Sequence, residues 1–247
     1  MHRFFLPEFS LTNRFITIQD KNEIHHIKNV LRLKTKDLVQ VFNATGLEIT
    51  GRIKTITNKR VDIDVTSQIQ RLAPKNQIIL ACAIPKKAKF ETIIEKCTEL
   101  GITEIIPMIT SRTEFSMSEE RGQKKQARYQ TVAINAAKQS QRPTIPKIHP
   151  IMTFKDALAY ITPNDLVFIP CLTEPRKHLK EFLTQKKIND RRIIYFIGPE
   201  GDFTIEEINQ AKDKGAIPIS LGNTTLKVDT AAISVMAFIN LALSDED

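Results

Sequence analysis

Two loops in the last fifty residues of the sequence combine glycines with charged side chains, each directly after an apolar run. The first covers residues 198–202 (GPEGD) after the run 193–197, and the second begins at Gly222 after the run 217–221. Glycine gives a backbone conformations and close approaches that a side chain would prevent. We therefore predict that both loops contact a ligand; the alternative is that they are ordinary turns.

The charges in the first loop restrict the choice of ligand. A phosphate-binding loop combines backbone amides with a Lys, whereas Glu200 and Asp202 would repel a phosphate. The chain has only eight glycines, and none has the G-x-G-x-x-G spacing of a dinucleotide site. The ligand that remains is small, bears hydroxyl groups and carries positive charge. S-adenosylmethionine fits this description through its sulfonium and ammonium groups.

Strand-like and helix-like patterns alternate through the last two thirds of the chain. This alternation is typical of an α/β fold with a mostly parallel sheet, which binds ligands at the carboxyl ends of its strands. Both glycine loops follow expected strands, and Thr204 with Glu207 forms a capping box that starts the intervening helix. The expected strands are 78–84, 104–109, 166–171, 192–197 and 217–221, and the expected helices are 90–100, 118–140, 153–161, 175–186, 204–214 and 230–243.

The first third of the chain follows a different pattern. Alternating apolar residues from Leu38 to Val65 predict short strands, after a helix from Asp20 to about Leu33 that a capping box of Asp20 and Glu23 would open. Residues 71–76 predict a linker. We therefore expect a small β-rich domain over residues 1–72 and an α/β domain over residues 73–247.

The charge balance favours a polyanionic partner. Lys and Arg outnumber Asp and Glu by 36 to 28, which gives a net charge of +8 and a pI of about 9.4. Residues 1–72 hold 12 basic and 7 acidic side chains, so the excess is concentrated in the first domain. This distribution predicts binding to RNA or DNA there. A solvated basic surface without a partner is the alternative.

Other features exclude several classes of protein. Cys82, Cys97 and Cys171 are odd in number and far apart, so they predict buried thiols rather than disulfides or a zinc site. The pair His25-His26 lacks a third ligand at a useful spacing, and we expect no metal. No apolar run is long enough for a signal peptide or a membrane span. We expect a soluble, cytoplasmic protein without a membrane partner.

A series of motifs, taken in order, resembles one family. They are residues 2–5 (HRFF), 25–33 (HHIKNVLRL), 85–87 (PKK), 91–101 (ETIIEKCTELG), 197–201 (IGPEG), 221–222 (LG) and 226–231 (LKVDTA). Together they resemble the bacterial small-subunit (16S) ribosomal RNA uridine-N3 methyltransferases of the SPOUT superfamily.

This resemblance implies a fold and an activity. It implies a small PUA-like β-barrel followed by a SPOUT α/β domain, with a trefoil knot at about residues 193–235. It further implies a homodimer that methylates N3 of a uridine in small-subunit ribosomal RNA, free or in the assembled subunit, with S-adenosylmethionine as cofactor.

The resemblance also assigns residues to sites. The RNA-binding residues would be Arg3, His25, Lys28 and Arg32. The cofactor-binding residues would be Leu172, Ile197, Gly198, Pro199, Glu200, Gly201, Ser220, Leu221, Gly222 and Leu226.

Methylation at uracil N3 requires removal of the proton from that nitrogen. A base, or a cation that stabilises the resulting anion, would supply this step. Asp229 or Glu200 could be the base, and Lys227 and Arg142 the cations. In the alternative interpretation Glu200 accepts hydrogen bonds from loop amides and Asp229 caps the final helix.

Several positions depart from the family pattern. Asp202 stands where the family has Gly, Thr224 and Lys227 where it has Arg, and Asp229 where it has Glu. In a central motif, Lys138 and Gln141 replace Glu and Gly. These changes keep two alternatives open: a catalytically silent RNA-binding or ribosome-assembly factor, and a SPOUT methyltransferase for another RNA nucleotide.

Overall fold

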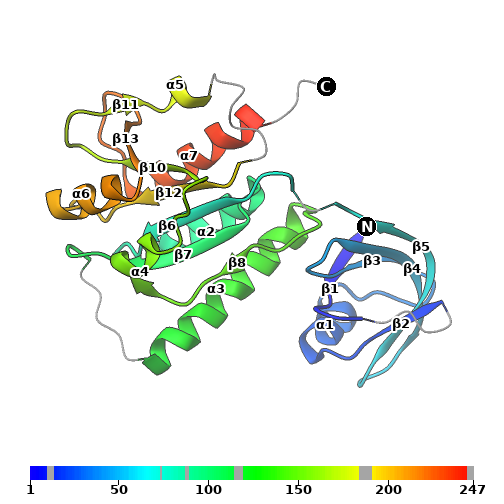
Figure 1. Cartoon of the computed structure of the whole chain (residues 1–247). Helices are drawn as coiled ribbons and strands as arrows, with labels where there is room; N and C mark the ends of the chain where they lie inside the picture. The colour runs from blue at the N-terminus through cyan, green and yellow to red at the C-terminus, as the bar shows by residue number, and fades with distance from the viewer. Residues whose placement is uncertain (10–13, 73, 87–88, 114–118, 184–190, 244–247) are drawn as a thin grey trace. The chain divides into compact units, whose positions relative to one another are not determined.

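The computed structural model describes residues 1–9, 14–72, 74–86, 89–113, 119–183 and 191–243. The chain forms two compact units (Figure 1). The first comprises Met1–Ala73 and Ala137–Ile145, and the second comprises Pro74–Ala136 and Pro146–Asp247. The first unit therefore also contains the end of the long helix α3 (Glu119–Gln139) and the turn that follows it.

A curled five-stranded sheet with the order β1-β3-β4-β5-β2 forms most of the first unit. β1 pairs parallel with β3, and the remaining neighbours are antiparallel. The strands β1 and β2 were not expected, because each has only four residues and pairs with a strand far along the chain. Register shifts in β4 at Thr50/Gly51 and Ile53/Thr55 interrupt its pairing with β5. The bounds are β1 His2–Phe5, β2 Phe15–Ile18, β3 Leu38–Phe42, β4 Leu47–Ile56 and β5 Val61–Gln70.

The helix expected from Asp20 to Leu33 consists of two parts. The α-helix α1 (Lys21–His25) continues into a π-helical turn, η1 (His26–Val30). Asp20 caps α1 by accepting hydrogen bonds from the amides of Asn22 and Glu23, both at 2.9 Å. The reciprocal half of the predicted capping box is wrong, because the Glu23 carboxylate accepts a hydrogen bond from Lys138 instead.

Lys138, a departure from the family pattern, lies within the first unit. Its Nζ is 2.5 Å from Oε1 of Glu23, and both side chains are largely buried, with 14% and 13% of their area exposed. Nζ also lies 6.0 Å from the centre of the Phe4 ring. Because a buried charge is costly without a partner, this pair accounts for the lysine as a structural residue that joins α3 to α1.

The second unit is built on an eight-stranded sheet with the path β11-β13-β10-β12-β6-β7-β8, and β9 pairs with β7. Every pairing in it is parallel, which confirms the predicted fold class. The strands are β6 Ile78–Ala83, β7 Glu104–Ile109, β8 Lys147–Ile148, β9 Met152–Thr153, β10 Leu166–Pro170, β11 Lys177–His178, β12 Ile193–Ile197 and β13 Ile217–Ser220. The helices besides α3 are α2 Lys89–Glu99, α4 Phe154–Leu158, α5 Lys180–Leu183, α6 Ile205–Asp213 and α7 Val228–Leu243.

One predicted helix of the second unit is wrong. Within the expected span 175–186, the described residues form the short strand β11 and the single helical turn α5. Lys177 and His178 pair with Ile219 and Ser220 of β13. These interstrand hydrogen bonds exist only in the folded sheet, so local sequence preference did not reveal them.

Helices cover both faces of this sheet. On one face, Phe154 of α4 packs against Phe196 of β12 and Phe203, with ring centres 5.8 and 5.3 Å apart. On the other face, the Tyr195 hydroxyl lies 3.8 Å from Sγ of Cys97 in α2 and 3.4 Å from the carbonyl oxygen of Ala232 in α7. The sheet is therefore buried on both sides, as parallel sheets usually are.

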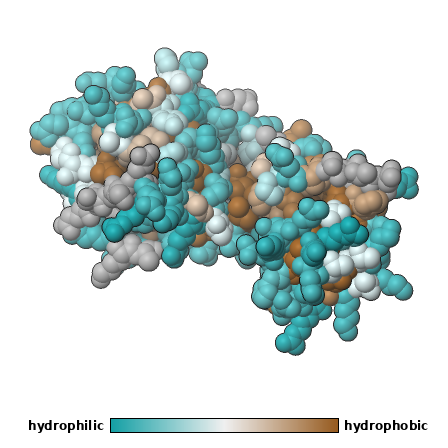
Figure 2. Space-filling view, turned by 90° about the horizontal axis from the view of Figure 1, so that it is seen from below, coloured by the Kyte–Doolittle hydropathy of each residue, from teal (hydrophilic) through white to brown (hydrophobic). Residues whose placement is uncertain are grey.

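Several simpler predictions concern burial and the surface. The three cysteines are buried free thiols, as expected. Within the described residues, no helix combines the length and apolar character that crossing a bilayer requires. Hydrophilic side chains dominate the face shown in Figure 2.

The path of a knot through residues 193–235 stays a prediction.

Candidate functional site

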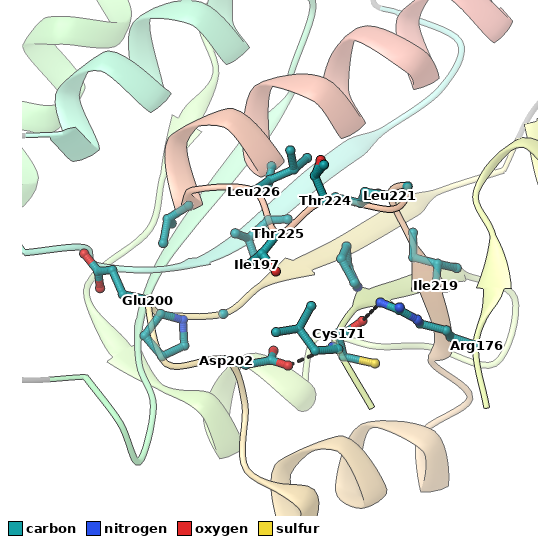
Figure 3. Close-up of a pocket in the computed structure, with 17 residues that line it drawn as sticks. Cys171, Arg176, Ile197, Glu200, Asp202, Ile219, Leu221, Thr224, Thr225 and Leu226 are labelled. Carbon is teal, nitrogen blue, oxygen red and sulfur yellow. Dashed lines mark hydrogen bonds between the residues drawn. The ribbon is translucent and has the colours of Figure 1, made fainter. Parts of the chain in front are cut away.

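A pocket lies at the carboxyl ends of β10, β12 and β13 (Figure 3). The loop after each of these strands lines it, and the start of α7 contributes further residues. Because β10 pairs parallel with both β12 and β13, the three loops emerge at the same edge of the sheet. The lining residues are Pro170, Cys171, Leu172, Arg176, Ile197, Gly198, Pro199, Glu200, Asp202, Ile219, Leu221, Gly222, Thr224, Thr225, Leu226, Val228 and Ala231.

The structure brings together most of the residues predicted to bind the cofactor. Those that line the pocket are Leu172, Ile197, Gly198, Pro199, Glu200, Leu221, Gly222 and Leu226. Gly201 and Ser220 are outside this lining. The Gly201 carbonyl accepts a hydrogen bond from Arg112, and the Ser220 hydroxyl donates to the Gly222 carbonyl at 3.2 Å. Both residues therefore make hydrogen bonds in or next to a pocket loop without lining the pocket themselves.

Sequence reasoning missed several lining residues, of which Arg176 is the most distinctive. Its Nη1 donates to the Cys171 carbonyl at 2.9 Å, and its Nε lies 2.6 Å from Oε1 of Glu174. Arg176 thus ties together the loop that follows β10. The position of this loop after an expected strand was the available signal, but the predicted helix over 175–186 obscured it.

The two carboxylates of the GPEGD loop have amide partners. Glu200 accepts a hydrogen bond from the Lys86 amide at 3.1 Å. Asp202 accepts from the amides of Leu172 and Phe203, both at 2.8 Å. The contact with the Lys86 amide therefore agrees with the alternative interpretation of Glu200, in which it accepts hydrogen bonds from loop amides.

Lys227 and Asp229 flank Val228 at the start of α7. Lys227 is exposed and its carbonyl accepts the first helical hydrogen bond, from the Ala231 amide at 2.8 Å. The Asp229 carboxylate lies 3.5 Å from Nζ of Lys89, with 26% of its side chain exposed. Its other oxygen, Oδ1, is buried and has no hydrogen-bond partner among the residues that the structure describes. A helix cap by this carboxylate is therefore not formed.

The remaining predicted site residues belong to the first unit. Burial lowers the pKa of Arg142 to about 10, so its guanidinium stays protonated at pH 7. His25 and Arg32 are exposed, and Arg32 has a φ of 53°. Nζ of Lys28 donates to the side chain of Asn58.

Arg3 lies in a different environment from the other predicted RNA-binding residues. Only 5% of its side chain is exposed. Its guanidinium donates to Glu48 and to the Ala137 carbonyl, and its Cζ lies 3.8 Å from the centre of the Phe42 ring. These contacts leave almost no area for a phosphate, and we exclude Arg3 from the proposed RNA contacts.

The pocket offers neither a reactive thiol nor a metal site. Burial raises the pKa of the Cys171 thiol, which therefore stays protonated and poorly nucleophilic at neutral pH. No group of three His, Cys, Asp or Glu side chains suited to a metal ion occurs in the described ranges. The residues that line the pocket offer apolar side chains, backbone groups, two carboxylates, one guanidinium, two threonine hydroxyls and the Cys171 thiol.

Comparison with known proteins identifies the family. Residues 72–240 match the family described as "RNA methyltransferase domain", and residues 18–66 match "RNA methyltransferase PUA domain". The chain belongs to this RNA methyltransferase family. The "Ribosomal RNA small subunit methyltransferase E" of Rickettsia conorii is 31% identical to it, covering 97% of this chain and 95% of the relative. The protein of the same name from Synechocystis is 32% identical, covering 90% of this chain and 71% of the relative.

Two solved structures of methyltransferases resemble the whole chain. The Neisseria gonorrhoeae ribosomal RNA small subunit methyltransferase E, bound to S-adenosyl methionine, has a TM-score of 0.86 at 27% identity, covering 98% of this chain and 97% of that one. A putative methyltransferase from Legionella pneumophila in complex with the same cofactor has a TM-score of 0.87 at 26% identity, covering 97% of each chain. These likenesses and the PUA match confirm the predicted PUA-like and SPOUT methyltransferase folds.

The glycines of the first loop give a test of how tightly the pocket is packed. A Cβ at Gly198 would lie 3.1 Å from the buried Phe203 ring, whereas a Cβ at Gly201 would meet its nearest atom, Cδ of Arg112, at 3.5 Å. We expect Gly198→Ala to lower the free energy of unfolding by about 1 to 3 kcal/mol through overpacking. Gly201→Ala, the matched control, should lie within about 0.5 kcal/mol of the wild type. Urea denaturation measures both, and equal stabilities would contradict the packing argument.

Proposed function

We propose that this protein uses S-adenosylmethionine to methylate N3 of a uridine in small-subunit (16S) ribosomal RNA in the cytoplasm. The observation that carries the proposal is the pocket at the carboxyl ends of β10, β12 and β13, lined by the GPEG loop and the loop from Leu221 to Leu226. Relatives that match this chain over nearly its full length bear the name of a small-subunit ribosomal RNA methyltransferase. Two structural neighbours contain the cofactor.

The pocket's composition fits this cofactor. Apolar side chains from three loops, including Ile197, Leu221 and Leu226, offer a surface for the adenine ring. The exposed carboxylate of Glu200 complements the positive sulfonium and ammonium groups. The guanidinium of Arg176 complements the carboxylate of the methionine part. A phosphate ligand would face the carboxylates of Glu200 and Asp202 and is therefore disfavoured.

The bound cofactor supplies an electrophilic methyl group, and the chain must supply a uracil whose N3 has lost its proton. Glu200 and Asp229 remain the candidates for the base. Glu200 is exposed and lines the pocket, whereas the Asp229 carboxylate is paired with Nζ of Lys89 at 3.5 Å. Lys227 is exposed next to two lining residues, Leu226 and Val228, where its charge can stabilise the uracil anion. Arg142 remains a second candidate cation.

The departures from the family pattern do not favour a silent binding protein. Lys138 forms a buried ion pair with Glu23 inside the first unit, so its charge serves the fold. Thr224 lines the pocket in place of the family's arginine, and the pocket retains its apolar wall. A methyltransferase for another RNA nucleotide remains the second candidate, which product analysis separates from the first.

Methyl transfer to small ribosomal subunits tests both the activity and the role of Lys227. Subunits from a strain that lacks the gene should accept labelled methyl groups, and mass spectrometry of nucleosides should identify 3-methyluridine. We expect Lys227→Met to lower kcat by roughly a hundredfold with nearly unchanged cofactor affinity, because the uracil anion develops only in the transition state. Lys227→Arg is the charge-preserving control. A different methylated nucleoside would support the second candidate, and normal turnover of the Met variant would remove Lys227 from the mechanism.

We propose that the first unit binds the RNA through Lys28, Arg32 and His25. Lys28 and Arg32 lie in and just after the π-helical turn η1, a type of turn often found at functional sites. Replacing both by Ala should reduce the slope of log K against log salt by about 1 to 2 units, because each phosphate contact releases counterions. Calorimetry should show wild-type cofactor binding in this variant. An unchanged salt slope would show that Lys28 and Arg32 do not contact the RNA.

We propose that the protein is a homodimer and that α7 lies in the interface. This helix buries one side against β12 and α2, yet its Phe238 and Leu241 are 56% and 73% exposed. They are three residues apart and so share one face of the helix. Phe238→Glu should convert the dimer to a monomer in analytical ultracentrifugation, whereas Ile205→Glu, at a 64% exposed position on α6, should not. A wild-type monomer, or a Phe238→Glu dimer, would contradict this proposal.

A further inference from the structure

Asp202 has a backbone conformation that is uncommon for a residue with a side chain. Its φ is 62°, in the left-handed region, where Asp and Asn are among the few non-glycine residues tolerated. The conformation belongs to a turn in which the Asp202 amide donates to the Pro199 carbonyl at 3.0 Å. A glycine would adopt this turn without strain. The aspartate therefore adds a carboxylate at a position that the backbone alone would leave to glycine.

The carboxylate of Asp202 connects two loops of the pocket. Oδ1 accepts from the Phe203 amide in its own loop, and Oδ2 accepts from the Leu172 amide, thirty positions earlier in the chain, both at 2.8 Å. The second of these bonds is drawn in Figure 3. Hydrogen bonds to an ionised acceptor are about twice as strong as neutral ones. One side chain thus fixes the spacing between the loop after β10 and the loop after β12.

Leu172 lies where the pairing of β10 with β13 ends. The last bond between β10 and β13 at this end joins the Cys171 amide to the Ile219 carbonyl at 3.3 Å, so the Leu172 amide lies just beyond the ladder. Its side chain is 55% exposed although it lines the pocket, and little core packing holds it. Arg176 anchors the same loop through the Cys171 carbonyl. Arg176 therefore binds the carbonyl, and Asp202 the amide, of the peptide bond between Cys171 and Leu172.

We propose that Asp202 is a positioning residue that holds the Leu172 loop against the GPEG loop and thereby raises the affinity of the pocket for S-adenosylmethionine. The inference rests on the proposed function for the identity of the ligand. A pocket whose loops are already in place binds more tightly, because less conformational freedom is lost on binding. Without the carboxylate, the Leu172 amide would turn to water and the loop would have to be ordered by the cofactor.

The main competing explanation is that the negative charge of Asp202 acts directly on the positive cofactor. Asp202→Asn separates the two, because it is neutral, tolerates the left-handed conformation and keeps one acceptor oxygen. Asp202→Gly removes the carboxylate and leaves the turn unstrained. Glu206→Gln is the matched control, because Glu206 is an exposed carboxylate at the start of α6 and lies outside the pocket lining.

Calorimetry of cofactor binding, with hydrogen exchange of the Leu172 amide in the cofactor-free protein, provides the test. For Asp202→Gly we expect about tenfold weaker binding and exchange at least about tenfold faster, the scale of one hydrogen bond to a charged group. Asp202→Asn should lie between this variant and the wild type, and Glu206→Gln should match the wild type. Binding of Asp202→Gly within about twofold of the wild type, or unchanged exchange at Leu172, would overturn the proposal. The Asn and Gly variants could instead lose equal cofactor affinity while the Leu172 amide of the Asn variant stays protected from exchange. That result would replace the positioning proposal with the charge explanation.

Enzyme kinetics distinguish positioning from general damage to the fold. At saturating cofactor, Asp202→Gly should turn over within about twofold of the wild type, so that its KM for the cofactor rises while kcat is kept. A fall in kcat together with a lower melting temperature would count against positioning. If the wild-type protein itself fails to bind S-adenosylmethionine, the proposed function is wrong, whereas exchange at Leu172 still reports whether Asp202 joins the two loops.

Discussion

Strand β10 lies between β12 and β13 and pairs parallel with both, so backbone hydrogen bonds deliver three carboxyl ends to one edge of the sheet. Residues that are distant in sequence, such as Leu172, Gly198 and Gly222, line one pocket for this reason. The helices on the two faces bury the sheet and keep the edge in place. A parallel sheet concentrates its loops in this way because each crossover returns the chain to the opposite edge.

Loops at such an edge leave backbone groups without partners in the ladder, and side chains of neighbouring loops satisfy several of them. Asp202 accepts from Leu172, Glu200 accepts from Lys86, and the guanidinium groups of Arg112 and Arg176 donate to carbonyls of Gly201 and Cys171. Each of these contacts joins a charged group to the backbone, and such bonds are stronger than neutral ones. The charged residues of the pocket thus shape it as well as setting its electrostatic character.

Charged residues of the first unit also serve two purposes, because some stabilise the fold and others remain on the surface. Arg3 and Glu48 form a pair that is almost fully buried, and Lys138 and Glu23 form a second pair. Breaking either pair would leave a buried charge without compensation. The positive charge of residues 1–72 is therefore divided between structure and surface, and the exposed part, including Arg32, is available to a polyanion. A formal net charge alone does not make this distinction.

Local sequence patterns determined the elements whose signals are complete within a short stretch. The strand Glu104–Ile109 and the capping box of Thr204 and Glu207 were found because apolar runs and capping residues act over a few positions. Tertiary structure alone decided β11, the partner of Lys138, the buried position of Arg3 and the bond from Leu172 to Asp202. Each of these depends on residues that folding brings together from at least thirty positions apart. Their energies arise from pairing and burial in the folded chain, which local propensity does not contain.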